Sequence, residues 1–440
     1  MKHTHGAAAV MAAMLLTAMP FLRMPVLSVA QADGEGSLSA VATAPYTALL
    51  SWTPDFDAAA YELEIFSSRN DSTESPQPSE TPLYQNHSIY TSSTIVHLKD
   101  VMPDVQRDDV LWWRVRPLDL DRRPIGSFTA LKPLQAGGIP PMEAAPLPRS
   151  HFNSGQGTTL LYPVYSFTPD DEASHFEVEV TDAPPESRDP VPSKHRVFSR
   201  VIENANLYDP SPRIGSYWWR VRSLDAEGNP LGPWSEAESF RTDPADGWQA
   251  GVLGDSISHG GGRLSYGPAD WAYSYESYLS FPVINLSQSG DTSEMTKDRF
   301  EADVVPFHLE YLLIMTGSNS LRAGIPPEAV IADLEAIQEK CRQNGITPIL
   351  LTLPPLNPAS IEKAFDEPTD EHWKKNFAIV NDWIRTQISI DTAAAFAGWE
   401  EMPQDLAADG IHGDWRAKEM MARVINEAMP RLAPDLPYKQ

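Results

Sequence analysis

An internal repeat constrains the fold of this chain more than any other feature of its sequence. The segment WWRVRPLD at residues 112–119 recurs as WWRVRSLD at residues 218–225. Successive side chains of a β-strand point to opposite faces, so the first copy would place Arg114 and Arg116 on one face and Trp113 on the other. A strand-like motif that occurs twice predicts two similar β-rich units.

The residues upstream of each repeat carry the same signals of short antiparallel strands. In both copies a Thr-Pro-Asp turn precedes an alternating apolar run, formed by Tyr61, Leu63 and Ile65 and by Phe176, Val178 and Val180. This alternation, without any helical period, predicts two antiparallel β-sandwiches over residues 33–135 and 150–243. The stretch 136–149, rich in proline and glycine, is predicted to be a linker. The second boundary, 242–247, is short, so we expect the second sandwich to lie close to the block that follows.

Both copies resemble a known module. The pattern W-x-P…Y-x-L-x-I…W-W-R-V-R…G-x-W-S…F is similar to the fibronectin type III module, and the second copy matches better. The first copy lacks the G-x-W-S element, and its strand connection at 67–95 is long and polar. The resemblance implies spacers or contact surfaces. The repeated tryptophans could form a sugar-binding face, but packing inside the sandwiches is the favoured interpretation.

From residue 248 the pattern changes to strands that alternate with helices. The expected strands are WQAGVLG (248–254), FPVINLS (281–287), LEYLLIMTG (309–317) and TPILLTLPP (347–355). The expected helices are WAYSYESYLS (271–280), PPEAVIADLEAIQEKCRQNG (326–345), EHWKKNFAIVNDWIRTQ (371–387) and WRAKEMMARVINEAM (415–429). Buried strands that alternate with helices predict an α/β domain over 248–440, in which helices cover both faces of a parallel sheet. Sites in such sheets lie beyond the carboxyl ends of the strands.

Polar residues follow several of these strands where a site is expected. Gly254-Asp255-Ser256 ends the first strand, and a serine there has an exposed hydroxyl and an outward N–H. Gly290 follows the second strand, and glycine lets its N–H approach a ligand closely. Asn319, two residues after Gly317, follows the third strand and supplies an amide donor. Near the end of the chain, Asp409 stands three residues before His412.

This combination resembles the SGNH/GDSL hydrolases, whose domain adopts a three-layer, flavodoxin-like α/β fold. The resemblance covers about residues 248–430, with all four motif blocks in the family's order. It implies that Ser256 is the nucleophile, that His412 is the general base and then acid, and that Asp409 orients His412. It also implies an oxyanion hole formed by the N–H groups of Ser256 and Gly290 and by the Asn319 amide. A serine hydroxyl needs such a neighbouring base to act as a nucleophile at neutral pH.

Other residues near the nucleophile have competing interpretations. His259 is a rival base, but His412 is favoured because it has a carboxylate nearby. Asp255 is expected to cap or brace its loop rather than react. We nonetheless count Asp255, His259, Arg263 and Tyr266 as candidate substrate-binding residues. The spacing of the histidines suggests no metal site, and no cofactor is expected.

Two departures from the family pattern leave the substrate open. Gly413-Asp414-Trp415 follows the histidine where a proline is common, and the second block has S-Q-S-G instead of a glycine-rich form. The loop after the nucleophile is rich in aromatic residues, which suit sugar faces and equally suit core packing. Together with the expected secretion and the acidic charge of the chain, these aromatic residues lead us to expect O-acetyl carbohydrate esters as substrates. Lipid or general short-chain acyl esters are the alternative, and a cell-surface binding protein that uses the hydrolase domain as a scaffold is an alternative of another class.

Residues 1–32 have the features of a cleaved secretory signal. They have a basic residue, Lys2, near their start, continue with a long apolar run and offer small residues at Ala30 and Ala32 for cleavage. Arg23 interrupts the apolar run, which disfavours the alternative of an uncleaved anchor. We expect a secreted or cell-surface/periplasmic protein without a membrane span after cleavage, whose sandwiches could contact a surface or a polysaccharide.

Charge and cysteine content narrow the remaining possibilities. The 440-residue chain carries 60 acidic against 34 basic side chains, a net charge of −26. Such a chain repels phosphate backbones, which argues against nucleic-acid binding. The single cysteine, Cys341, cannot form an internal disulfide, and its place on the apolar stripe of a predicted helix indicates a packed thiol.

Overall fold

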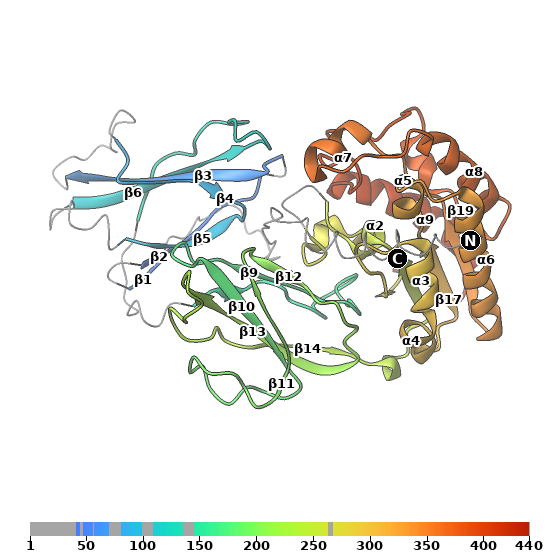
Figure 1. Ribbon diagram of the computed structural model, residues 1–440, viewed down its shortest axis with the longest axis horizontal. Coiled ribbons are helices and arrows are strands. Elements are labelled where there is room, and N and C mark those ends of the chain that lie inside the picture. The colour runs from blue at the N-terminus through green and yellow to red at the C-terminus, as the bar shows by residue number, and fades with distance from the viewer. Residues whose placement is uncertain are drawn as a thin grey trace, which may run out of the picture.

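The computed structural model describes residues 41–44, 47–55, 57–69, 81–98, 109–134, 145–262 and 267–439. Figure 1 shows three units: two formed by strands, and a third in which helices surround a sheet. The predicted signal segment, Arg263, Tyr266 and most of the predicted linker lie outside the described residues.

The first unit pairs a three-stranded with a four-stranded antiparallel sheet. The smaller sheet contains β1 (Val41–Ala44), β2 (Thr47–Ser51) and β5 (Ser93–His97). The larger sheet contains β4 (Tyr84–Ile89), β3 (Ala60–Arg69), β6 (Asp109–Leu118) and β7 (Lys132–Pro133). One apolar core contains residues of both sheets, such as Leu50 of β2 and Leu63 of β3, so the unit is a sandwich.

The second unit has the same construction. Its three-stranded sheet contains β12 (Asn206–Tyr208), β9 (Val164–Thr168) and β8 (Leu147–Pro148). Its four-stranded sheet contains β11 (Arg196–Ile202), β10 (His175–Thr181), β13 (Gly215–Leu224) and β14 (Glu238–Thr242). Strand β8 lies in the segment expected to be linker, and it pairs with β9, so the end of that segment belongs to the sandwich.

The repeated motif lies at the centre of each sandwich, on β6 and β13. Trp113 and Trp219 are almost fully buried, at 1% and 0% exposure, which confirms the core interpretation of these tryptophans. On the opposite face the motif's arginines pair with glutamates of the neighbouring strand, as Arg220 does with Glu179 at 2.5 Å. In the second sandwich the ring of Trp234 lies 4.4 Å from that guanidinium. The alternation predicted from the sequence therefore separates an apolar face from an ion-paired face.

The third unit contains five parallel strands in the order β16-β15-β17-β18-β19. These strands are β15 (Ala250–Gly254), β16 (Ile284–Asn285), β17 (Tyr311–Met315), β18 (Thr347–Leu351) and β19 (Ser389–Ile390). In chain order this is 2-1-3-4-5, the flavodoxin-like arrangement, in which the connections diverge between the first and third strands. The parallel α/β sheet expected over 248–440 is confirmed for this unit.

Helices cover this sheet. The α-helices are α2 (Ser256–His259), α3 (Ser293–Asp298), α4 (Phe300–Asp303), α5 (Ser318–Arg322), α6 (Pro327–Gln343), α7 (Pro358–Phe365), α8 (Trp373–Arg385) and α9 (Trp415–Leu432). Short 3-10 helices are η3 (Pro244–Asp246), η4 (Trp271–Tyr273), η5 (Tyr275–Tyr278), η6 (Val305–Phe307) and η7 (Thr392–Phe396). The three long predicted helices are confirmed as α6, α8 and α9. None of the described helices is long and apolar enough to cross a bilayer.

The helix expected over 271–280 is wrong. Two 3-10 turns occupy this stretch, separated by Ser274, whose backbone is extended (φ −117°, ψ 123°). Tyr273 and Tyr275 are both fully buried. In a surface helix, two residues that are two positions apart point to opposite faces, so both could not be buried. The aromatic side chains of this segment therefore pack inside the domain, and the broken backbone lets them do so.

The second sandwich is joined to the sheet of the third unit by backbone pairing. Residues 159–162, which we call the strap, run parallel to the edge strand β16. The Leu161 N–H donates to the Asn285 carbonyl at 2.8 Å, and the Asn285 N–H donates to the Thr159 carbonyl at 3.0 Å. Leu161 and Tyr162 belong to the apolar core of the third unit. The two units were expected to lie close together, and they do so through a shared sheet edge and a shared apolar core.

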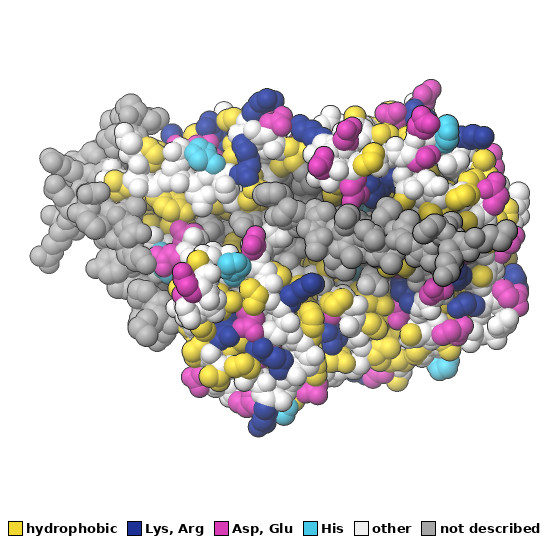
Figure 2. Space-filling model, in the orientation of Figure 1, with side chains coloured by type: hydrophobic (Ala, Val, Ile, Leu, Met, Phe, Trp, Pro, Cys, Tyr) yellow, Lys and Arg dark blue, Asp and Glu magenta, His cyan; other side chains and the backbone are white. Residues whose placement is uncertain are grey.

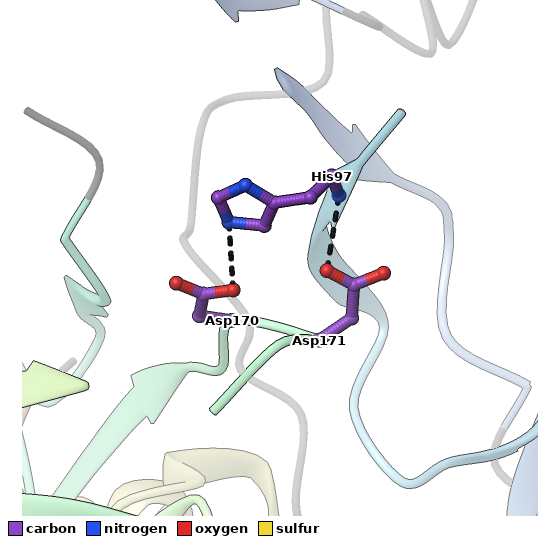
Figure 3. Close-up of side chains that lie close together, drawn as sticks. All are labelled: His97, Asp170 and Asp171. Carbon is purple, nitrogen blue, oxygen red and sulfur yellow. Dashed lines mark hydrogen bonds and ion pairs between the residues drawn. The ribbon is translucent and has the colours of Figure 1, made fainter. Parts of the chain in front are cut away.

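The two sandwiches meet at a separate polar junction (Figure 3). His97 Nε2 lies 2.8 Å from Asp170 Oδ1, and the His97 N–H donates to Asp171 Oδ1 at 3.0 Å. Figure 2 shows acidic and basic side chains interspersed over the described part of the visible face.

Candidate active site

The candidate site lies at the carboxyl ends of β15, β16 and β17. Gly254 ends β15 beside Met315 of β17, and a Cβ at residue 254 would lie 2.1 Å from the Met315 carbonyl oxygen. Only glycine fits this approach. Asp255 then caps the N-terminus of α2, where its carboxylate accepts from the Ile257 N–H at 3.0 Å, and Ser256 begins the helix. This close packing fixes where Ser256 leaves the sheet.

Ser256, His412 and Asp409 form one hydrogen-bonded chain. His412 Nε2 lies 2.7 Å from Ser256 Oγ, and His412 Nδ1 lies 2.7 Å from Asp409 Oδ2. The other oxygen of Asp409 accepts the N–H groups of Ile411 and His412, at 2.9 and 2.8 Å. One carboxylate therefore fixes both the backbone and the ring of His412, so that its outer nitrogen faces the serine.

The charge of Asp409 is stabilised although the side chain is only 1% exposed. Burial alone would raise the Asp409 pKa, but the charge and hydrogen bond of His412, together with the two backbone donors, lower it overall. A carboxylate that stays ionised in this position favours the proton on the facing His412 nitrogen, Nδ1. It thereby leaves Nε2 as an acceptor toward Ser256.

The expected oxyanion donors follow the carboxyl ends of the neighbouring strands β15, β16 and β17. Gly290 has a φ of 91°, and nothing lies within 4 Å of the Cβ that another residue would have there. The N–H groups of Ser256 and Gly290 have no backbone acceptor among the described residues. Asn319, on α5, donates one amide hydrogen to the Asp291 carbonyl at 2.9 Å, which leaves its second amide hydrogen for another acceptor.

Asp255 caps its loop, as expected, and both Asp255 and His259, two of the four candidate substrate-binding residues, are buried. Asp255 is 0% exposed, and burial raises its pKa to about 7. His259 is 2% exposed, and both of its ring nitrogens are hydrogen-bonded within the protein, to Ser289 and to the Tyr162 carbonyl. Both side chains therefore support the loops that carry Ser256 and Gly290. Arg263 and Tyr266 lie outside the described residues.

Two buried groups of opposite charge near the helix of Ser256 could not be recognised from the sequence. Lys418 of α9 is 0% exposed and donates to the Ile257 carbonyl at 2.6 Å. Burial lowers the Lys418 pKa and raises that of the equally buried Glu276, while the opposite charge of each favours its partner's charged form. The available signal was a lysine on the apolar stripe of α9, shared with Met421 and Ile425.

One described group of side chains has the ligand types of a divalent-cation site. Ligand atoms of His97, Asp170 and Asp171 lie within 4.8 Å of one another. Both oxygens of Asp171 already accept hydrogen bonds, from the His97 N–H and the Tyr84 hydroxyl, and Asp170 contacts the imidazole. The group is thus internally paired as it stands. Sequence spacing could not predict it, because residue 97 and residues 170–171 belong to different sandwiches.

Comparison with known proteins identifies the third unit. Residues 252–415 match the GDSL-like lipase/acylhydrolase family. The chain is 25% identical to the thioesterase 1/protease 1/lysophospholipase L1 of Escherichia coli over 190 residues, which cover 40% of this chain and 85% of that protein. The third unit is therefore a hydrolase domain of the GDSL/SGNH family. The protein is an enzyme of the esterase and acylhydrolase class.

Solved structures similar to this chain include two named hydrolases. A lipase/acylhydrolase from Enterococcus faecalis is 20% identical, with a TM-score of 0.35, and the match covers 43% of this chain and 98% of that one. A catalytic mutant of an acetylxylan esterase from Geobacillus stearothermophilus is 19% identical, with a TM-score of 0.31, and the match covers 41% of this chain and 93% of that one.

Proposed function

We propose that the protein hydrolyses esters through an acyl-enzyme, with Ser256 as the nucleophile, His412 as the base and Asp409 as its orienting carboxylate. The observation that carries this proposal is the continuous path from Asp409 through His412 to Ser256, with both contacts at 2.7 Å. Serine hydrolases use such a path because the imidazole can remove the hydroxyl proton while the carboxylate stabilises the resulting imidazolium.

The proposed reaction has two halves. The Ser256 oxygen attacks the ester carbonyl carbon while its proton passes to His412 Nε2. The tetrahedral intermediate then collapses, the bond to the leaving alcohol breaks, and His412 returns the proton to that alcohol. In the second half His412 takes a proton from water, the hydroxide attacks the acyl-serine, and the acid leaves as Ser256 regains its proton.

The negative charge that develops on the carbonyl oxygen needs donors held in place beforehand. We assign this role to the N–H groups of Ser256 and Gly290 and to the Asn319 amide. The bond from Asn319 to the Asp291 carbonyl supports this assignment, because it fixes the amide plane before substrate binds. Removal of one such donor typically lowers kcat by about 100- to 1,000-fold.

For the substrate we propose O-acetyl esters of carbohydrates. The support is the aromatic composition of the loop after Ser256, together with a sequence start typical of exported proteins. The burial of Tyr273 and Tyr275 reduces this support, because these two rings serve packing. A lipid or thioester substrate is the second candidate, favoured by the likeness to the Escherichia coli thioesterase/lysophospholipase.

The proposal includes a location and a role for the sandwiches. We propose that residues 1–32 direct export and that the fibronectin III-like sandwiches act as spacers or as contacts to a surface or polysaccharide. A binding protein with an inactive hydrolase scaffold is the contrasting possibility. Sequencing the N-terminus of secreted material would identify cleavage after Ala30 or Ala32, whereas a retained N-terminus would contradict export by cleavage.

Hydrolysis of p-nitrophenyl acetate tests the reaction. The Ser256→Ala variant should lose about 1,000-fold or more of kcat while its circular dichroism stays that of the wild type. Ser258→Ala, a matched change two residues along the same short helix, should retain activity. Equal rates in wild type and Ser256→Ala would contradict the proposed nucleophile. Acetate release from acetylated polysaccharides, assayed beside turnover of lysophospholipids and acyl thioesters, then tests the substrate class.

A further inference from the structure

The strap of the second sandwich contacts the supports of two catalytic loops through a single residue. The Tyr162 carbonyl lies 2.8 Å from His259 Nε2, and the Tyr162 hydroxyl donates to Asp303 Oδ2 at 2.7 Å. These two contacts face different elements: His259 ends the helix that begins at Ser256, and Asp303 ends α4. A residue that precedes β9 of a sandwich thus lies within the framework of the hydrolase site.

The His259 ring connects the strap to the loop that bears Gly290. The Ser289 N–H donates to His259 Nδ1 at 3.1 Å. A backbone N–H can only donate and a backbone carbonyl can only accept, so the two partners define one tautomer. Nδ1 accepts from Ser289, and Nε2–H donates to Tyr162. Burial lowers the His259 pKa to about 4, so the ring stays neutral and keeps this acceptor at neutral pH.

The second contact of Tyr162 leads to the same loops. Asp303 pairs with Arg299 at 3.0 Å, and that guanidinium also donates to the carbonyls of Leu286 and Gly254, at 2.5 and 3.0 Å. These carbonyls lie where the chain leaves β16 and β15 toward Gly290 and Ser256. Tyr162 therefore supports the Gly290 loop through His259. Through Asp303 and Arg299 it supports both this loop and the loop of Ser256.

We propose that the second sandwich is a structural part of the active site, and that His259 is a positioning residue that transmits its hold to the Ser289–Gly290 loop. The tyrosine carbonyl fixes the imidazole, the imidazole fixes the Ser289 N–H, and the neighbouring Gly290 N–H is thereby aimed at the oxyanion. The last step rests on the proposed function of Gly290. The hold on the loop does not.

Two variants of the full chain separate the two sides of the ring. In His259→Asn the amide oxygen can occupy the position of Nδ1 and accept from Ser289, whereas the bond to Tyr162 is lost. In His259→Gln the amide nitrogen can occupy the position of Nε2 and donate to Tyr162, whereas the Ser289 N–H loses its acceptor. We expect kcat for p-nitrophenyl acetate to fall by about 10- to 100-fold in His259→Gln, because the Ser289 N–H loses its acceptor. In His259→Asn, which keeps that acceptor but loses the contact with Tyr162, kcat should fall by a smaller factor of about 3- to 10-fold, and KM should stay within about threefold in both variants.

Hydrogen exchange of the amides in residues 286–291 supplies a readout that needs no catalysis. Exchange should be faster in His259→Gln than in His259→Asn, and the Ser289 amide should be protected in the wild type. A His259→Asn variant with the kcat of the wild type, a His259→Gln variant no slower than His259→Asn, or a wild-type Ser289 amide that exchanges like an exposed loop would each overturn the inference. A wild type that fails to turn over esters would instead refute the proposed function, while the exchange measurement would still decide whether His259 holds the loop.

Discussion

Replacing Tyr162 by phenylalanine tests whether the second sandwich and the hydrolase domain unfold together. The change removes only the hydroxyl that donates to Asp303, in a side chain that is 4% exposed. Hydrogen bonds to charged groups contribute about 1.5–3 kcal/mol, and Asp303 keeps its partner Arg299. We therefore expect the free energy of unfolding to fall by about 2 kcal/mol.

The second sandwich offers a matched control with the same chemistry. The Tyr165 hydroxyl donates to Asp209 Oδ2 at 2.8 Å, and Arg213 pairs with that carboxylate at 2.7 Å. All three residues lie within the sandwich. Tyr165→Phe should therefore cost a similar free energy without touching the junction.

Urea denaturation followed at 222 nm distinguishes the two ways of unfolding. The described α-helices all lie in the hydrolase domain, so this signal reports on that domain. If the shared core couples the two units, Tyr162→Phe and Tyr165→Phe should both lower the midpoint of the helical signal. A Tyr165→Phe variant whose helical transition coincides with that of the wild type would refute this coupling. So would a Tyr162→Phe variant with unchanged stability.

Three further predictions concern individual charged groups. Asp409→Asn should lower kcat by about 100- to 10,000-fold in a stopped assay at neutral pH, because the amide no longer favours the tautomer that faces Ser256, and an unchanged kcat would exclude the assigned role. Lys418→Met should destabilise the fold by about 1–3 kcal/mol in urea, because the buried Ile257 carbonyl loses its donor, and a variant as stable as the wild type would contradict this reasoning. The same change should raise the pKa of Glu276 further, because the carboxyl loses the positive charge that favours its ionised form. The junction in Figure 3 should weaken as pH rises from 4 to 8. Burial raises the Asp171 pKa to about 7, so ionisation of this carboxyl above pH 3.8 disfavours the folded state. The pKa of His97 is lowered by burial but raised overall by Asp170, so the folded state loses the stabilising proton of His97 above pH 6.5. Asp171→Asn should accordingly stabilise the protein at pH 8 by about 1–3 kcal/mol in thermal unfolding, and a variant that is less stable there would contradict this sign.

The candidate catalytic residues could be predicted from sequence because each is marked by local chemistry. Gly254 precedes Ser256 where the Met315 carbonyl leaves no room for a side chain, and Gly290 has a positive φ. Asp409 reaches the ring of His412 across three residues. Short-range constraints of this kind leave a pattern in the sequence, as do the long amphipathic helices α6, α8 and α9.

The supports of the site could not be predicted, because their contacts are distant in sequence. Tyr162 and Asp303 are 141 residues apart, and His259 contacts Tyr162 across 97 residues. Nothing in the local sequence around His259 distinguishes a substrate contact from a buried brace. The segment 271–280 misled for a related reason: its spacing fits a helix, but packing of Tyr273 and Tyr275 into the core requires a broken backbone.

The parallel pairing of the strap with β16 has a consequence for how this architecture can be rearranged. An enzyme domain cut away at residue 248 would lose the partners of the Asn285 N–H and carbonyl, and unpaired backbone groups at a sheet edge favour aggregation. We therefore expect the catalytic domain of this chain to be less stable or less soluble when it is produced without the second sandwich. A shortened protein should therefore retain the second sandwich, whose strap pairs with the edge strand β16.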